Sequence, residues 1–248
     1  MTLTHDIAGD GRTVVLLHSG VCDRRMWDPQ RPALLDAGYR VVRCDFRGFG
    51  ETPAATGPAR DDDDVLDLLD TLGLSRVTLV GSSYGGRMAL HVAARWPDRV
   101  DDLVLLCSGR PDHEAGPEVR AFGAREDELL EAGDVDGATE LNVATWLGPD
   151  ADDAARRAVF EMQRHAFDVQ LAAEEYPAPD ATVDLGRITA PSFVVSGAKD
   201  LPDFRQIAVD LADQLPDSTH VELPWAGHLP NLERPAETTA LLLSALSR

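Results

Sequence analysis

A glycine-flanked serine is the residue of this sequence with the clearest chemical potential. The segment Gly81–Gly85 reads G-S-S-Y-G, follows the apolar run Val77–Val80 and precedes a helical pattern. A strand, a tight turn and a helix in this order hold a serine hydroxyl at the carboxyl end of a sheet. Glycines two positions to either side let the strand and the helix approach each other. The pattern predicts Ser83 as a nucleophile, whereas Ser82 lacks glycines in that register.

A serine hydroxyl attacks at neutral pH only with the help of a base that an acid orients. The predicted base is His228, in a glycine-containing segment after the last predicted strand. Asp200 is the predicted acid, because it comes just beyond the end of the preceding strand. Asp203 is a rival that suits a helix N-cap, and Asp112 is a more distant alternative. The chain order Ser83, Asp200, His228 is that of nucleophile, acid and base in such a fold.

The oxyanion of a tetrahedral intermediate needs hydrogen-bond donors as well. The backbone N–H of Tyr84, directly after the nucleophile, is the first predicted donor. The second is expected in the loop after the strand Val14–Leu17, which reads H-S-G-V, with Gly20 as the choice and Val21 as the alternative. His18 is expected to brace this loop through hydrogen bonds rather than to act as a base.

Short β-branched runs alternate with helical patterns over most of the chain. The predicted strands are Val14–Leu17, Arg40–Cys44, Val77–Val80, Leu103–Cys107, Ser192–Ser196 and His220–Leu223. Several have no clear polar face, which is typical of strands buried on both sides of a parallel sheet. The predicted helices start in the run Asp61–Asp64 or span Gly85–Trp96, Phe204–Leu215 and Pro235–Leu246. This alternation predicts an α/β fold with a doubly wound, mostly parallel sheet.

The aspartate run Asp61–Asp64 has two possible interpretations. Four adjacent carboxylates resemble a metal cluster, but acidic residues in the first turn of a helix also stabilise its dipole. We expect the second role.

The alternation stops between about Pro111 and Leu185. The patterns there are helical and amphipathic, over Glu126–Ala132, Gly137–Leu147 and Asp152–Phe167. We predict a single domain whose core comprises residues 1–110 and 186–248, with a helical cap inserted at 111–185. A cap of this kind would cover the carboxyl end of the sheet.

Three tryptophans are candidates for lining a substrate pocket. Trp146 lies in the predicted cap, and Trp27 and Trp225 lie near the predicted mouth of the site. Packing in the core explains each of them equally well.

Composition excludes several classes of function. The 248 residues include 23 basic and 43 acidic side chains, a formal net charge of −20, so binding to nucleic acid is not expected. No run reaches the roughly 20 apolar residues of a membrane span, and the first residues have no hydrophobic stretch typical of a signal peptide. Three widely spaced cysteines argue against disulfides and a zinc site. We therefore expect a cytoplasmic protein without a membrane partner.

Together these motifs resemble the α/β-hydrolase superfamily over nearly the whole chain. The resemblance rests on segments 16–20 (L-L-H-S-G), 45–50 (D-F-R-G-F-G), 197–200 and 227–228 and on the turn at Ser83. It places the family's nucleophile, acid and base at Ser83, Asp200 and His228, and its oxyanion residue at Gly20. The D-x-R-G-x-G segment is expected to brace the loops around the site.

The sequence departs from the family pattern at two places. Ser19 stands where the family usually has the glycine of its H-G pair. Few residues precede the first predicted strand, so the family's first antiparallel strands are expected to be abbreviated or partly missing.

Residues and resemblance together favour a serine hydrolase with a helical cap, similar to small bacterial esterases and enol-lactone hydrolases. Such an enzyme would cleave a carboxylic ester or lactone of a small, largely apolar substrate through an acyl-enzyme on Ser83, without a metal or organic cofactor. The same site could instead hydrolyse a C–C bond or carry out cofactor-free perhydrolysis. A third alternative is a low-turnover ligand receptor of the same fold. The sequence leaves the oligomeric state open.

Overall fold

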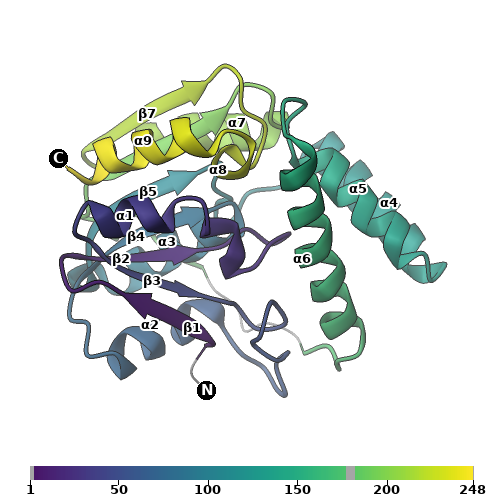
Figure 1. Cartoon of the computed structure of the whole chain (residues 1–248), viewed down its shortest axis with the longest axis horizontal. Helices are drawn as coiled ribbons and strands as arrows, with labels where there is room; N and C mark the ends of the chain where they lie inside the picture. The colour runs from purple at the N-terminus through teal and green to yellow at the C-terminus, as the bar shows by residue number, and fades with distance from the viewer. Residues whose placement is uncertain (1–2, 177–181, 248) are drawn as a thin grey trace.

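A seven-stranded sheet forms the centre of the computed structural model, which describes residues 3–176 and 182–247 (Figure 1). The strand order is β1-β3-β2-β4-β5-β6-β7, and every neighbouring pair is parallel except β1 and β3. The strands are β1 (His5–Ala8), β2 (Thr13–Leu17), β3 (Arg40–Cys44), β4 (Val77–Ser82), β5 (Val100–Leu106), β6 (Ser192–Gly197) and β7 (Ser218–Leu223). The doubly wound, mostly parallel sheet is confirmed. The six predicted strands are present, and β1 is an additional, short antiparallel edge.

The helices follow the predicted alternation closely. They are α1 (Arg31–Asp36), α2 (Asp61–Thr71), α3 (Tyr84–Arg95), α4 (Pro117–Glu131), α5 (Val135–Trp146), α6 (Asp153–Leu171), α7 (Pro202–Gln214), α8 (Pro230–Glu233) and α9 (Pro235–Leu246). Short 3-10 turns occupy Arg24–Trp27, Pro97–Arg99 and Leu185–Arg187. The short α1 and α8 were not predicted, because they have too few residues to show a helical period.

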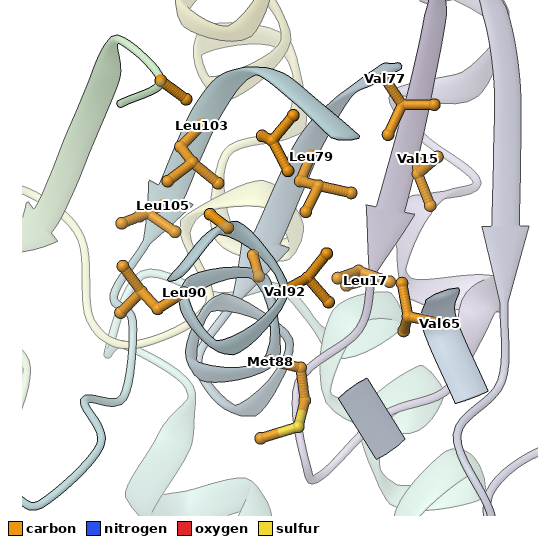
Figure 2. Packing of buried hydrophobic residues seen from close by; sticks show 14 of the residues in the cluster. Val15, Leu17, Val65, Val77, Leu79, Met88, Leu90, Val92, Leu103 and Leu105 are labelled. Atoms are coloured by element: carbon orange, nitrogen blue, oxygen red, sulfur yellow. The ribbon is translucent and has the colours of Figure 1, made fainter. Parts of the chain in front are cut away.

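Alternating residues of the strands supply two separate hydrophobic cores, because successive side chains of a strand point to opposite faces. On one face Val15 and Leu17 pack in a cluster with residues of α2, α3 and α7, of which Val65, Met88 and Val92 are visible in Figure 2. On the other face the neighbouring strand residues pack with α1 and α9. The sheet is therefore covered on both sides, as the apolar strands predict.

Helices α4, α5 and α6 follow one another between β5 and β6 and lie together beside the sheet, at the right of Figure 1. Helix α6 is anchored by Val159 and Met162, which belong to one of the two cores. Helix α4 begins at Pro117 rather than at the predicted Glu126, since proline suits the first turn of a helix. The division into core and cap stays a prediction, and residues 177–181 of the proposed cap lie outside the described residues.

None of the helices in the described ranges has the length and apolar character needed to cross a membrane.

The aspartate run forms the first turn of α2, as predicted. Asp62 accepts hydrogen bonds from Arg60 and Arg95, both at 2.7 Å. Asp64 pairs with Arg47, with an N–O distance of 2.6 Å. The aspartates of this run therefore stabilise the dipole of α2, and they also form ion pairs with residues outside the helix.

Next to this run, His91 of α3 makes stability depend on pH. The residue is 2% exposed, and neither ring nitrogen has a hydrogen-bond partner among the described residues. Burial lowers the pKa of His91, Asp62 opposes this shift, and the arginines 60, 87 and 95 add to it. Folded His91 therefore takes up a proton at lower pH than the unfolded chain does.

We expect the free energy of unfolding to fall as pH drops below about 6.5, the usual histidine pKa, by up to about 1.4 kcal/mol per pH unit for this group. Urea unfolding at pH 7.5 and pH 5.5 measures the loss, and His91→Gln should lose less than the wild type. An equal loss in both proteins would show that His91 does not contribute.

Candidate active site

Ser83 lies in a strained turn between β4 and α3. Its backbone angles are φ 52° and ψ −112°, in a region that residues with a side chain rarely adopt. The turn is held by β5 and the loop that follows it. The Ser83 N–H donates to the Leu106 carbonyl at 2.9 Å, and the Gly109 N–H donates to the Ser83 carbonyl at 3.0 Å. The fixed backbone holds the Ser83 side chain at the carboxyl end of the sheet.

The two glycines of the motif allow a close approach of backbone segments. A Cβ atom on Gly81 would lie 2.6 Å from the Gly86 Cα, and one on Gly85 would lie 2.6 Å from the carbonyl oxygen of His18. Real Cβ atoms essentially never come this close to backbone. Helix α3 can therefore pack against β4 and the end of β2 only with glycine at both positions.

Gly85→Ala should consequently lower the free energy of unfolding by about 1–3 kcal/mol, because overpacked backbone has to shift. The shift would also move the Ser83 turn, so we expect activity to fall too. Gly57→Ala is the matched control, since a Cβ there meets nothing within 4 Å. Urea denaturation of both variants measures the effect, and equal stabilities would refute the close-approach argument.

The predicted nucleophile, base and acid lie in one hydrogen-bonded line. His228 Nε2 is 2.7 Å from Ser83 Oγ, and His228 Nδ1 is 2.7 Å from Asp200 Oδ2. The side chains of His228 and Asp200 are 2% and 1% exposed. The Asp200 carboxylate fixes Nδ1 as the protonated nitrogen and leaves Nε2 as the acceptor for the serine proton. This geometry fits a general base that activates a hydroxyl.

The two rival acids lie elsewhere. Asp203 lies inside α7 and accepts the Gly116 N–H at 2.8 Å, so it caps α4 and not its own helix as the sequence suggested. The reason is that α7 already starts at Pro202. Asp112 is exposed, with a positive φ of 60°. Asp200 is thus the carboxylate that contacts His228.

Glu233 of α8 is a buried acid whose role the sequence did not indicate. Its two carboxylate oxygens accept the backbone N–H groups of Gly227 at 2.7 Å and Leu229 at 3.0 Å, on either side of His228. It therefore fixes the loop that carries the imidazole. A glutamate a few residues after the histidine was visible in the sequence, but only the short helix α8 turns it back toward the loop.

Aromatic rings enclose the imidazole of His228. The ring centre of Phe204 lies 4.2 Å away and that of Trp146 lies 4.7 Å away. Phe122 packs edge-on against Trp146 at 4.9 Å. Helices from the predicted cap and the predicted core thus shield the histidine from water.

A cavity of about 460 Å³ opens beside Ser83 and His228. It is bounded by residues of the β2 loop, of α7 and of the helices α4, α5 and α6. The lining side chains are Ser19, Gly20, Val21, Ser83, Val119, Phe122, Gly123, Glu126, Asn142, Trp146, Gln163, Phe167, Gln170, Phe204 and His228. Its size suits a small molecule.

Of the three candidate tryptophans, only Trp146 lines this cavity. Trp27 is fully buried in the core that also contains α1 and α9, because its 3-10 turn faces inward. Trp225 lies under the guanidinium of Arg234, 4.9 Å from ring centre to Cζ. The expectation that Trp27 and Trp225 line the pocket was wrong.

The predicted oxyanion donors lie next to the serine. Tyr84 is the first residue of α3, so its N–H has no acceptor within the helix. Gly20 and Val21 both line the cavity, and the backbone N–H of neither donates to another described residue. A Cβ on Gly20 would be 3.5 Å from the Tyr84 Cβ, so the two loops face each other closely.

His18 braces the β2 loop, as expected. Its Nε2 accepts the Phe46 N–H at 2.9 Å, so Nδ1 carries the proton and donates to the Ser19 carbonyl at 2.8 Å. The residue is completely buried, and this burial lowers its pKa. A neutral imidazole with both nitrogens engaged connects the predicted oxyanion loop to the segment after β3.

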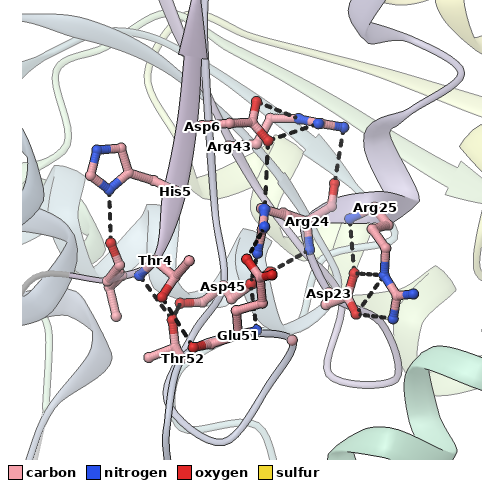
Figure 3. Close-up of polar contacts among 12 residues, drawn as sticks. Thr4, His5, Asp6, Asp23, Arg24, Arg25, Arg43, Asp45, Glu51 and Thr52 are labelled. Atoms are coloured by element: carbon pink, nitrogen blue, oxygen red, sulfur yellow. Dashed lines mark hydrogen bonds and ion pairs between the residues drawn. The ribbon is translucent and has the colours of Figure 1, made fainter.

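The D-x-R-G-x-G segment forms a second brace, shown in Figure 3. Asp45 accepts the backbone N–H groups of Arg24 at 2.8 Å and Glu51 at 2.9 Å, and it also binds the Arg24 guanidinium. Gly50, with φ 50°, lets the turn pass next to the Asp45 carboxylate. The carboxylate therefore joins the 3-10 turn at Arg24–Trp27 to the turn that follows β3.

Cys107 is a further neighbour of the His228–Asp200 pair. One ligand atom from each of these three residues lies within 4.8 Å of the others, a spacing that would suit a metal ion. Burial, with the charge of Asp200, raises the pKa of Cys107 well above its usual range, which disfavours the thiolate that binds metals. Its thiol contacts the Gly227 carbonyl at 3.6 Å, which favours a packing role.

Comparison with known proteins supports this architecture. A protein from Variovorax paradoxus that is a candidate carbamate hydrolase, RutD, is 32% identical over 262 residues, covering 100% of this chain and 97% of its own. A thermophilic esterase from Thermogutta terrifontis has a TM-score of 0.83 at 28% identity, covering 99% of this chain and 93% of its own. An enol-lactonase from Burkholderia xenovorans has a TM-score of 0.82 at 26% identity, covering 99% and 96%.

The model of the alpha/beta hydrolase fold family matches residues 12–235. The match includes the Ser83 turn, Asp200 and His228 and extends over most of the described sheet. The chain therefore belongs to the α/β-hydrolase family.

Proposed function

We propose that the protein is a serine hydrolase that cleaves a carboxylic ester or lactone of a small substrate through an acyl-enzyme on Ser83. The observation that carries the proposal is the hydrogen-bonded line from Ser83 Oγ through His228 to Asp200, with 2.7 Å at each step, beside a cavity of small-molecule size. The similarity to an esterase and an enol-lactonase supports the choice of ester and lactone.

In the first half of the reaction, His228 Nε2 takes the proton of Ser83 as Oγ attacks the carbonyl carbon. The negative charge that develops on the carbonyl oxygen is stabilised by the backbone N–H of Tyr84 and that of Gly20 or Val21. Asp200 stabilises the imidazolium and keeps it oriented. His228 then gives its proton to the leaving alcohol, and the acyl group stays on Ser83.

In the second half, water takes the place of the alcohol and loses a proton to the same Nε2. The hydroxide oxygen bonds to the acyl carbon, the bond to Ser83 Oγ breaks, and the proton returns to the serine. Every proton transfer uses one residue, His228, which the rings of Trp146 and Phe204 hold in place.

A carbamate is the second candidate substrate, because the relative named as a candidate carbamate hydrolase is 32% identical along the whole chain. Its carbonyl would meet the same nucleophile and the same donors. The difference lies in the acyl-enzyme, where nitrogen donation makes the carbonyl of a carbamoyl-serine less reactive toward water.

The test is release of p-nitrophenol from p-nitrophenyl esters of two to eight acyl carbons, from p-nitrophenyl dimethylcarbamate, and ring opening of a γ-lactone. We expect steady turnover of an ester or a lactone and dependence of kcat/KM on acyl length, because the aromatic side chains Phe122, Trp146 and Phe204 line the cavity. A single burst on every ester, without further turnover, would instead favour a receptor of the same fold.

A further inference from the structure

Gln163 of α6 is a buried amide without a partner in the cavity wall. The residue is 4% exposed, it lines the cavity beside Ser83 and His228, and its Oε1 has no hydrogen-bond partner in the part of the chain that the structure describes. Buried side-chain oxygens are normally paired, so an unpaired amide oxygen in a cavity wall points to a partner supplied by the ligand.

The neighbouring amide of the same wall shows the contrast. Asn142 Nδ2 donates to the Ala138 carbonyl at 2.9 Å and to Glu126 at 2.5 Å, and Asn142 Oδ1 accepts the Trp146 indole N–H at 3.1 Å. Asn142 is thus fully engaged in holding Trp146 and Glu126. Within the described ranges, the Oε1 of Gln163 makes no such contact.

The same wall carries a carboxylate without a counter-ion. Glu126 lines the cavity, accepts one hydrogen bond from Asn142 and forms no ion pair within the described part of the chain. Among the described residues, the lining contains no lysine or arginine. Arg24 and Arg25 do not line this cavity and are paired with Asp45 and Asp23. The cavity therefore disfavours the binding of a negatively charged substrate.

We propose that the cavity selects uncharged substrates that carry an amide group away from the scissile carbonyl, with Gln163 pairing to that amide and Glu126 repelling carboxylates. An amide offers a donor and an acceptor, and the terminal torsion of glutamine is roughly two-fold, so Gln163 can turn its oxygen or its NH₂ toward the ligand. This specificity rests on the hydrolase function proposed above, and it differs from the largely apolar substrate expected from the sequence.

Three p-nitrophenyl esters of nearly equal shape test the proposal. Their acyl groups come from adipic acid monoamide, from adipic acid with its free carboxylate, and from 6-methylheptanoic acid, in which an isopropyl group replaces the carboxamide. The assay measures kcat/KM at pH 8 for the wild type, Gln163→Met and Glu126→Gln. Two exposed residues supply matched controls, Gln206→Met on α7 and Glu128→Gln on α4.

For the wild type we expect the carboxylate ester to react at least about tenfold more slowly than the amide ester. In Gln163→Met the ratio of amide to isopropyl ester should fall about threefold to tenfold, the effect of one lost hydrogen bond. In Glu126→Gln, kcat/KM for the carboxylate ester should rise relative to kcat/KM for the amide ester. Neither control should change these ratios.

A wild type that hydrolyses the carboxylate and amide esters equally well would overturn the proposal, whatever the variants do. Ratios that stay constant in Gln163→Met, with all three rates scaled together, would show a structural role for Gln163. If the wild type hydrolyses neither the isopropyl ester nor any other ester, the proposed hydrolase function itself is refuted. The two failures are thus distinguishable.

Discussion

Ser83→Ala is expected to abolish turnover of every ester that the wild type hydrolyses, with a loss in kcat of up to about 10⁶-fold. The reason is that no other described hydroxyl is hydrogen-bonded to His228, the base in the line from Ser83 to Asp200. The alanine variant keeps the cavity, and only the attacking atom is removed. We therefore expect substrate binding to survive, measurable as retained affinity for an unreactive ketone analogue.

Ser82→Ala is the natural control, because Ser82 is adjacent in the chain, buried, and has an Oγ without a hydrogen-bond partner in the described ranges. Its turnover should stay close to that of the wild type. Activity that survives in Ser83→Ala, or that disappears in Ser82→Ala with the fold intact, would contradict the choice of nucleophile.

The second large effect is expected for Asp200→Asn, with kcat reduced by about 10⁴-fold. An asparagine amide facing His228 Nδ1 would favour the tautomer with its proton on Nε2, where it cannot accept the serine proton. Steady-state kinetics at pH 8 measures the loss, and the free energy of unfolding checks that the fold is retained.

Asp203→Asn is the control that separates the loss of the acid next to His228 from a general loss of stability. Asp203 caps α4 through Gly116 and is not in contact with His228, so the variant should lose stability and keep most of its kcat. If Asp203→Asn were the slower variant, the acid would have been assigned to the wrong residue.

Regular elements were predictable where local pattern and burial agree. β4 and β6 are short, apolar and buried on both sides, so their sequences alone indicate a parallel sheet. β1 could not be located from its own residues, because a four-residue edge strand with a half-exposed pattern looks like a loop, and the family resemblance implied only abbreviated or partly missing first strands. Its existence depends on pairing with β3, a contact that the sequence does not encode locally.

The hydrogen-bonded line of Ser83, His228 and Asp200 was predictable because each of its residues follows a strand. Ser83 and Asp200 come after β4 and β6, and parallel strands bring such positions to one edge of the sheet. The surroundings were not predictable in the same way. Glu233 depends on how α8 turns, and Trp27 on which way a 3-10 turn faces. Both are set by tertiary packing rather than by a periodic pattern.

The shared position of Glu126 and Gln163 in the cavity wall could not be predicted from the sequence either. They lie on separate helices, α4 and α6, and nothing in their spacing indicates that both reach the same wall. An unpaired amide can be recognised only when the partners of its neighbours are known. Substrate preference is therefore harder to infer from sequence than reaction type.

The most direct test of Ser83 as the nucleophile is covalent labelling with diisopropyl fluorophosphate, followed by intact mass measurement and peptide mapping. An activated serine displaces fluoride and gains one diisopropylphosphoryl group. We expect one group per chain, on Ser83, loss of activity in proportion to labelling, and no labelling of Ser83→Ala. A label on another residue, or an unlabelled chain that still hydrolyses esters, would contradict it.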